Sequence, residues 1–388
     1  MGLNPRYKIF IIGSAYPLRP GGITTFNELF CRSLQEMGHD AQIVSYSLQY
    51  PNVLFPGSSQ FDHSAPPPEG IKIHTLINSI NPFNWFKVAR FIRSEKPDFV
   101  VARYWIPFMG PALGTICRRI KKSGIKVIAI TDNVIPHEKK FYDNFSTKYF
   151  IRSCDGFVAM SKAVLADLEK FISTKHKKFL VHPIYNAFGE KMDKLEARKK
   201  LGINANEKLL LFFGLIRQYK GLDLLLQAMA DPRIKSASIK LLVAGEFYEP
   251  KKNYTDLIHK LGLEQSVVIA DKFIPNDEVK YYFSASDLLT LTYRTATQSG
   301  VTQVAFQFEK PVLATNVGGL SEIILDGKSG YVVAPHVKMI ADKILDFYEN
   351  NREASMSAVM AQEKKKYEWS IFSENIVNLY EEIKHDHT

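Results

Sequence analysis

The sequence has few cysteines and no long apolar run. Its three cysteines, Cys31, Cys117 and Cys154, lie far apart and form no C-x-x-C pair. This set argues against a disulfide framework or a zinc ribbon, and it fits buried thiols in a reducing cytosol. No stretch reaches the roughly 18 consecutive apolar residues of a membrane span, and the run Ile9–Ile12 is too short for the core of a signal peptide. We therefore expect a soluble protein, or one peripheral to a membrane.

Signatures of several common sites are missing as well. The loop after the first apolar run has neither the G-x-G-x-x-G fingerprint nor a P-loop, which argues against a simple NAD or ATP site. The H-E-x-x-H spacing of zinc enzymes is absent. No aromatic–basic platform or helix-turn-helix signature is visible, so nucleic acid is not an expected partner. We expect neither a metal nor another cofactor.

Positive charge is in excess, with a formal net charge of +10. Such an excess attracts anions, whether nucleic acid, acidic lipid or a phosphorylated substrate. The densest clusters are Arg118–Lys122, Lys175–Lys178 and Lys364–Lys366. Each cluster also fits a solvated helix end or loop. Charge alone therefore leaves peripheral association with an anionic membrane open.

Short apolar runs alternate with helical patterns from end to end, which is typical of doubly wound α/β folds. The run Lys8–Ile12 predicts a buried strand, and the 3.6-residue periodicity after it predicts a helix. A second cycle of the same kind starts near Asp193. The length of 388 residues suits two domains. We predict Rossmann-like parallel-sheet domains over residues 1–185 and 186–365 that face a cleft, with a final helix in 366–388 packing back on the first domain.

Two loops after predicted strands carry residues suited to phosphate groups. Gly21 and Gly22 precede the first helix, where backbone N–H groups and the helix dipole favour anions. Two glycines also fit an ordinary tight turn. Arg217 and Lys220 follow the strand Leu209–Phe213, and together they offer a bidentate grip and a point charge for a diphosphate. They could equally be solvated loop cations, but ligands of such sheets bind at the carboxyl ends of strands.

Three further loops carry polar side chains that could hold a substrate. One precedes a helix and offers hydroxyl, amide and free N–H groups from Gln298, Ser299, Gly300 and Gln303. Ser299 alone also fits a helix N-cap. Glu322 could accept hydrogen bonds from a sugar or ribose, or could be a carboxylate in the first turn of a helix. Asp132 and His137 follow a strand, and the imidazole could shuttle protons, bind a sugar hydroxyl or be polar surface.

Taken in order, these motifs resemble the retaining GT-B glycosyltransferases of family four, which use nucleotide-sugar donors. The resemblance covers nearly the whole chain. The elements that carry it are the Gly21–Gly22 loop, Gly214–Gly221 with Lys220 on the family's lysine, Phe273–Glu278 followed by Tyr281 and Tyr282, Lys310–Thr315 with Gly318, Gly319 and Glu322, and Gly327–Pro335. The resemblance implies that Phe273 and Ile274 lie beside the nucleotide base.

The sequence departs from the family pattern at two places. Leu215 stands where the family has its arginine, and we expect Arg217 to serve instead. The family's paired glutamates, seven residues apart, are missing. The second falls on Val304, beside Gln303, and the first falls near residues 296–297. We interpret the polar residues of this stretch as neutral replacements that hydrogen-bond sugar and ribose.

The resemblance also implies a mechanism without metal or enzymic nucleophile. The acceptor hydroxyl attacks from the face that the diphosphate leaves, and a diphosphate oxygen takes the proton. The protein positions the reactants and stabilises the leaving group. Arg217, Lys220 and the Gly22 amide would provide this stabilisation. Asp132 and His137 would contact the transferred sugar or the acceptor.

We therefore expect a cytoplasmic transferase, acting in part at the inner face of the plasma membrane. It would move a sugar from a nucleotide-diphosphate sugar to a glycan or lipid-linked acceptor, and so build a cell-surface polysaccharide or glycolipid. Two alternatives stay open. The missing glutamates would suit a catalytically silent sugar-nucleotide-binding partner, and a nucleotide-sugar epimerase shares the architecture. Retention of Arg217 and Lys220 favours the transferase and the silent sugar-nucleotide-binding partner over a generic scaffold.

Overall fold

The chain folds into two units, each built on one parallel sheet. The computed structural model describes residues 5–19, 21–51, 60–62, 66–135, 143–184, 188–296 and 299–386. Unit 1 comprises residues 1–182 and 369–388, and unit 2 comprises residues 183–368. The sequence places the breaks after residues 185 and 365, and the structure places them after 182 and 368.

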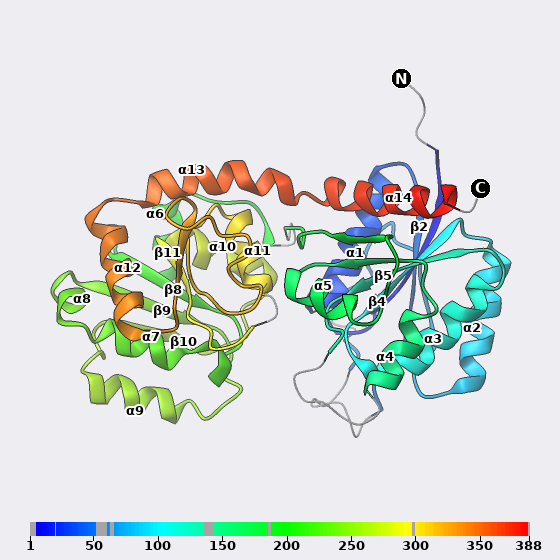
Figure 1. Cartoon of the computed structure of the whole chain (residues 1–388). Coiled ribbons are helices and arrows are strands. Elements are labelled where there is room, and N and C mark those ends of the chain that lie inside the picture. The colour runs from blue at the N-terminus through cyan, green and yellow to red at the C-terminus, as the bar shows by residue number, and fades with distance from the viewer. Residues whose placement is uncertain are drawn as a thin grey trace. The chain divides into compact units, whose positions relative to one another are not determined.

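Figure 1 shows the sheet of unit 1 with helices around it. Its strand order is β3-β2-β1-β4-β5-β6-β7, with every neighbouring pair parallel. Its central strands are buried on both faces because helices cover both sides of the sheet. The strands are β1 (Lys8–Ile12), β2 (Asp40–Leu48), β3 (Ile73–Asn78), β4 (Phe99–Tyr104), β5 (Lys126–Thr131), β6 (Gly156–Ala159) and β7 (Lys177–Phe179).

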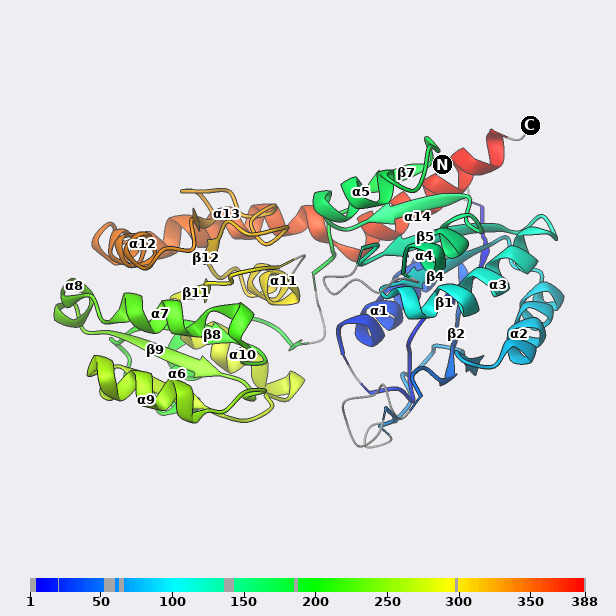
Figure 2. The same cartoon turned by 60° about the horizontal axis from the view of Figure 1, so that its bottom comes forward.

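Helices on the two faces of this sheet enclose two separate cores. One core takes side chains from α2, α3, α4 and α5, and the other from α1 and α14. Figure 2 shows the backbone of these helices around the sheet. The helices of unit 1 are α1 (Gly22–Glu36), α2 (Pro82–Glu95), η2 (Pro107–Met109), α3 (Gly110–Lys121), α4 (Asp143–Ile151), α5 (Lys162–Glu169) and α14 (Trp369–His385). The side chains of Asn81 and Ser161 cap α2 and α5 by accepting hydrogen bonds from backbone N–H groups, and both residue types are favoured at this position.

The final helix, α14, belongs to unit 1 although it follows unit 2 in the chain. Its Phe372 ring packs edge-on against Phe26 and Phe30 of α1, with ring centres 5.5 and 5.6 Å apart. Ser373 and Ser33 share a buried hydrogen bond of 2.8 Å. The helix therefore closes one face of the first sheet.

Unit 2 repeats the same strand order, β10-β9-β8-β11-β12-β13, again with parallel neighbours. Its strands are β8 (Lys208–Phe213), β9 (Ile239–Ala244), β10 (Val267–Ala270), β11 (Leu288–Leu291), β12 (Val312–Thr315) and β13 (Gly330–Val333). Both sheets thus have the Rossmann-like order in which the winding reverses beside the first strand. The predicted fold class is confirmed.

The helices of unit 2 also lie on both faces of their sheet, with α7, α8, α9 and α12 sharing one core and α6 and α10 packed together elsewhere. The helical segments are α6 (Lys194–Leu201), η4 (Gln218–Lys220), α7 (Leu222–Met229), α8 (Pro232–Ser236), α9 (Lys252–Leu261), α10 (Asn276–Ala285), α11 (Gly300–Gln307), α12 (Val337–Glu349), α13 (Glu353–Glu363) and η5 (Lys364–Tyr367). Within the ranges given above, no helix is both long and apolar enough to cross a bilayer.

Candidate active site

The winding of the second sheet reverses between β8 and β11, and the loops that follow these two strands are joined there. Gly221 has a left-handed φ of 66°, and a Cβ on it would lie 2.1 Å from the carbonyl oxygen of Thr292. The Thr292 hydroxyl donates to the Gly221 carbonyl at 2.8 Å. Only glycine fits this close approach. The β8–α7 loop is therefore held against the end of β11, where ligands of such sheets bind.

Lys220 is a buried cation in this loop. Its residue is 7% exposed, and its Nζ lies 5.6 Å from the centre of the Tyr293 ring. In the part of the chain that the structure describes, Nζ makes no ion pair and no hydrogen bond. Burial, and then the neighbouring charge of Arg217, lowers the pKa of Lys220 to about 8. A buried ammonium group without a partner is costly, so this position suits an anionic ligand.

Arg217 lies three residues before Lys220 and is exposed. Its guanidinium group lies 4.9 Å from the centre of the Tyr248 ring and makes no ion pair among the described residues. The backbone beside it is fixed, because the N–H of Gln218 donates to Glu249 at 2.6 Å. The loop thus presents one buried and one solvent-facing cation, neither of them neutralised by a carboxylate.

The N-terminus of α11 lies beside the same loop. Ser299 is at the N-cap position without capping the helix, and its Oγ lies 3.2 Å from the Tyr293 hydroxyl. A Cβ on Gly214 would lie 3.1 Å from the Nζ of Lys220 and 3.5 Å from the side chain of Val301. Uncapped N–H groups at a helix start favour anions. The structure therefore brings Lys220 close to the start of α11.

Gln303 of α11 is 5% exposed, and its Oε1 is buried without a hydrogen-bond partner. The Oγ1 of Thr302 is likewise buried without a hydrogen-bond partner. Gln298 lies outside the described residues. Buried polar atoms without partners are uncommon in folded proteins, and each calls for a ligand or a local reason.

The other two donor-site predictions fall on the loops after β10 and β12. Phe273 is 66% exposed, whereas Ile274 is buried at 7%. β9 lies between β10 and β8, so Phe273 follows a strand two places from that of Lys220. Glu322 is half-buried in a run of turns rather than in a helix, so its alternative reading as a first-turn helix carboxylate is wrong.

In unit 1 the predicted glycine loop opens α1. Gly21 is at the N-cap with extended backbone and no side-chain cap, and the helix begins at Gly22. Both glycines are exposed. A Cβ on Gly21 would meet no atom within 4 Å, so space does not require glycine at this position.

Asp132 is engaged by a residue that the sequence reasoning missed. Arg103, the fifth residue of β4, donates through Nε and one Nη to the two carboxylate oxygens of Asp132, each at 2.6 Å. Burial raises the pKa of Asp132, and Arg103 opposes that rise. A charged residue near the end of the apolar run Phe99–Tyr104 was the available signal. His137 lies outside the described residues.

Arg103 itself is 2% exposed and stacks on Phe26, with 3.9 Å between the guanidinium carbon and the ring centre. Its remaining Nη1 is buried without a partner. The ion pair therefore leaves the Nη1 group of Arg103 available as a hydrogen-bond donor. This group lies at the carboxyl end of β4, next to the point where the winding of the first sheet reverses. Asp132 orients this arginine, because its two oxygens accept from two different nitrogens of the guanidinium group.

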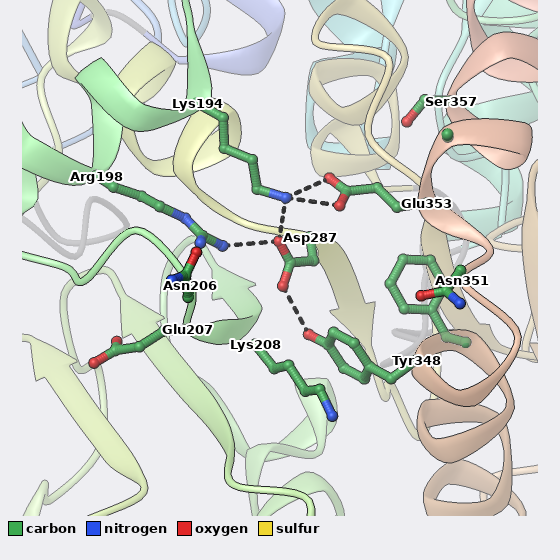
Figure 3. A pocket seen from close by; sticks show the side chains of 12 residues that line it. Lys194, Arg198, Asn206, Glu207, Lys208, Asp287, Tyr348, Asn351, Glu353 and Ser357 are labelled. Carbon is green, nitrogen blue, oxygen red and sulfur yellow. Dashed lines mark hydrogen bonds and ion pairs between the residues drawn. The ribbon is translucent and has the colours of Figure 1, made fainter.

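A second hollow lies where β11 begins, and its charged side chains pair with one another (Figure 3). Asp287, just before β11, accepts from Arg198 at 2.9 Å, from the Tyr348 hydroxyl at 3.1 Å and from Lys194. Lys194 also pairs with Glu353 at 2.6 Å. These charges satisfy one another and tie α6, β11 and α13 together, so we assign the hollow a structural role. The ranges that the structure describes hold no cluster of His, Cys, Asp or Glu fit for a metal ion.

Two family models match the chain in succession. Residues 20–187 match Glycosyltransferase Family 4, and residues 193–367 match Glycosyl transferases group 1. The chain belongs to the family 4 glycosyltransferases. Membership makes it an enzyme of the transferase class, EC 2.4.

Relatives of this family match along the whole chain. An uncharacterized glycosyltransferase of Methanocaldococcus jannaschii is 23% identical, over 96% of this chain and 97% of its own. N-acetyl-alpha-D-glucosaminyl L-malate synthase of Bacillus anthracis is 24% identical, over 98% of this chain and 97% of its own. The similarity therefore spans both units.

Solved structures of glycosyltransferases share the fold. Sucrose-phosphate synthase from Thermosynechococcus elongatus superposes with a TM-score of 0.75 at 15% identity, covering 98% of this chain and 100% of that one. HepE of Anabaena in complex with UDP superposes with a TM-score of 0.71 at 18% identity, covering 96% and 98%. The architecture is GT-B, as the resemblance implied.

Proposed function

We propose that this family 4 transferase moves a sugar from a nucleoside-diphosphate sugar to a glycan or lipid-linked acceptor, with retention of the anomeric configuration. The observation that carries the proposal is Lys220, a buried cation at the reversal point of the second sheet that has no partner among the described residues. A diphosphate would supply the missing counter-charge. Its second contact would be Arg217, whose planar fork suits phosphate oxygens.

The chemistry that we propose for this site is leaving-group stabilisation. The bond between the anomeric carbon and the diphosphate oxygen breaks, and the acceptor oxygen bonds to that carbon from the same face. The acceptor proton passes to a diphosphate oxygen. Negative charge grows on the diphosphate during this step, so Lys220, Arg217 and the N–H groups at the start of α11 lower the barrier. None of these roles needs a metal.

For the donor, we propose a uridine diphosphate sugar as the first to test. The support is indirect, since it comes from the fold of HepE, whose structures contain UDP and UDP-glucose. The sugar would meet a neutral wall, in which the unpartnered Oε1 of Gln303 accepts from a hydroxyl group. We propose that Phe273 covers the base, because its exposed ring lies on the loop after β10.

For the acceptor, we propose a site on unit 1 at the carboxyl ends of β1, β4 and β5. Gly21 and Gly22 would bound it on one side, and the spare Nη1 of Arg103 would donate to the acceptor. Asp132 would hold that arginine in place. We place the reaction in the cytoplasm, at the inner face of the plasma membrane when the acceptor is carried on a lipid, and in the synthesis of a cell-surface polysaccharide or glycolipid.

A thermal-shift panel of UDP, GDP, ADP and TDP sugars tests the donor site directly. One nucleotide class should raise the melting temperature of the wild type. Arg217→Ala and Lys220→Ala should lose that stabilisation and should lose transfer. Lys260→Ala serves as the control, because Lys260 is an exposed lysine of the same unit on α9. Donor turnover close to wild type in both site variants would refute the assignment.

A further inference from the structure

The outer surface of α2 carries apolar side chains that stay exposed to solvent to a large extent. Phe83 is 80% exposed, Phe86 is 38% exposed, and Ile80, just before the helix, is 50% exposed. The helix buries its opposite side, with Val88, Ala89 and Ile92, in the core of unit 1. Large aromatic side chains clustered on a surface mark an interaction site more often than isolated ones do.

Cations without counter-ions surround these side chains. Helix α3 packs beside α2 (Figures 1 and 2), and residues 80–94 and 110–124 hold seven Lys and Arg residues but no Asp or Glu. Glu95, the last residue of α2, pairs with Lys8. Lys121 is paired with Asp155, and Arg118 donates to the carbonyl of Tyr149. The remaining cations are exposed and make no ion pair among the described residues; they are Lys87, Arg90, Arg93, Arg119 and Lys122.

The apolar and basic groups form one continuous surface. The guanidinium carbon of Arg119, on α3, lies 4.1 Å from the centre of the Phe86 ring on α2. Near the carboxyl ends of both helices, Arg90, Arg93 and Lys96 line a hollow with Ser94 and Ser123 and no acidic side chain. A phosphate group would find three cations there.

The other two basic clusters of the sequence are different, because their lysines are largely neutralised. Lys175, Lys177 and Lys178 pair with Asp386, Glu169 and Glu382. In the third cluster, Lys364 pairs with Glu309, and Lys366 with Glu363. Only the cluster on α3 combines unpaired charge with exposed aromatic side chains, and this combination distinguishes it from an ordinary solvated helix end.

We propose that the α2–α3 face, formed by Ile80, Phe83 and Phe86 with the five unpaired cations, docks on a bilayer rich in anionic lipid. Phe83 and Phe86 enter the boundary between headgroups and acyl chains, where aromatic side chains of interfacial helices lie. The cations face lipid phosphates, and the hollow at Arg90, Arg93 and Lys96 takes one headgroup phosphate. The net positive charge draws the protein to the negatively charged surface. Docking on the bilayer would bring the enzyme to the lipid-linked acceptor proposed above. The docking itself does not depend on that acceptor.

Vesicle flotation tests the proposal with the full-length protein. Wild type should float with vesicles of phosphatidylcholine and phosphatidylglycerol and should not float with phosphatidylcholine alone. Arg90→Glu with Arg93→Glu should weaken binding more than tenfold, because each basic residue contributes about 1 kcal/mol near an anionic surface. Phe83→Ser with Phe86→Ser should weaken it at constant charge. The matched control is Lys252→Glu with Lys260→Glu on α9, which makes the same charge change on exposed residues of unit 2 and should keep most of the binding.

Three results would overturn the proposal. Wild type would fail to float with the anionic vesicles, the α9 control would lose as much binding as the α2 variants, or light scattering would show a dimer that the Phe83→Ser, Phe86→Ser variant abolishes. Stabilisation by the donor nucleotide is measured on every variant and should be unchanged. Loss of donor binding in wild type would refute the proposed function and leave the flotation result to stand by itself.

Discussion

Lys220 shows how the free-energy cost of one buried charge can indicate a ligand site. Lowering the pKa of Lys220 from 10.5 to about 8 corresponds to about 3 kcal/mol against the charged form in the folded protein. A carboxylate neighbour would remove most of that cost, and none is paired with it among the described residues. Strained or desolvated groups of this kind persist where function requires them.

Lys220→Met should therefore stabilise the free enzyme while it removes donor binding. Methionine fills the buried volume without the unpaired charge, so the free energy of unfolding at pH 7 should rise by about 1–3 kcal/mol. Urea unfolding with and without donor measures both effects. A loss of stability in the free protein would mean that Lys220 has a structural partner and is not held for an anion.

The pH dependence of donor affinity should follow the charge of Lys220. The folded-state pKa of about 8 lies below the unfolded value of 10.5, so the charge that binds diphosphate is present below pH 8 and is lost above it. Affinity for the donor should fall about tenfold between pH 7 and pH 9. Calorimetric titration of wild type at both pH values measures this change, and a donor affinity that stays constant between them would contradict a contact between Lys220 and the diphosphate.

The stability of the free protein should change in the opposite direction. Between pH 8 and pH 10.5 the unfolded chain holds a proton that folded Lys220 has released, so the contribution of this group to stability rises with pH. The unfolding free energy of wild type should approach that of Lys220→Met across this window. A difference between the two proteins that stays constant with pH would contradict the lowered pKa.

At the scale of elements, the site depends on how the loop after β8 is fixed to the end of β11. Gly221 and Gly202 have nearly the same left-handed φ, 66° and 67°. A Cβ would meet the Thr292 carbonyl oxygen at 2.1 Å on Gly221, but no atom within 4 Å on Gly202. Substitutions at the two glycines therefore distinguish the cost of backbone strain from the cost of a steric clash.

Gly202→Ala should cost about 1 kcal/mol, the strain of a left-handed alanine, and should leave donor affinity unchanged. Gly221→Ala should cost more than about 2 kcal/mol and should also weaken donor binding, because the loop carrying Lys220 must move away from β11. Denaturant unfolding and donor titration of both variants measure these effects. Equal costs and equal affinities would show that the joint between the two loops does not position the site.

At the scale of the whole molecule, the chain completes its first unit with its last helix. Phe372 is 3% exposed and lies in a cluster with Trp369, Ile376 and the aromatic residues of α1. Contacts so distant in sequence make the stability of unit 1 depend on residues that follow unit 2.

Phe372→Ala should lower the stability of unit 1 by about 3–5 kcal/mol through the cavity it leaves. Phe145→Ala is the control, since Phe145 lies in the same unit and is 76% exposed. Differential scanning calorimetry should show a lower transition for unit 1, while donor stabilisation of unit 2 persists. Loss of donor stabilisation in Phe372→Ala would show that unit 2 does not fold independently of this helix.

Local patterns in the sequence determined the alternation of strands and helices, the caps at Asn81 and Ser161, and the loop that carries Lys220. These features depend on neighbours a few residues apart, so periodicity and turn chemistry reveal them. The repeated parallel order followed from the same alternation, since strand–helix–strand connections have one hand. The local structure at Glu322 was harder to predict, because the sequence fits a helix start as well as the turns that the loop forms.

Only the tertiary structure decided which charges are satisfied. The sequence does not distinguish Arg217 and Lys220 from Lys194 and Arg198. Asp287 neutralises Lys194 and Arg198, whereas Arg217 and Lys220 form no ion pair with any residue that the structure describes. Asp132 was predicted to meet the substrate, and the structure gives both of its oxygens to Arg103. Pairing between charges depends on contacts between residues dozens of positions apart, and burial fixes their cost. The sequence by itself determined the family and the position of its loops, whereas burial and long-range pairing determined which of their residues are left to bind a ligand.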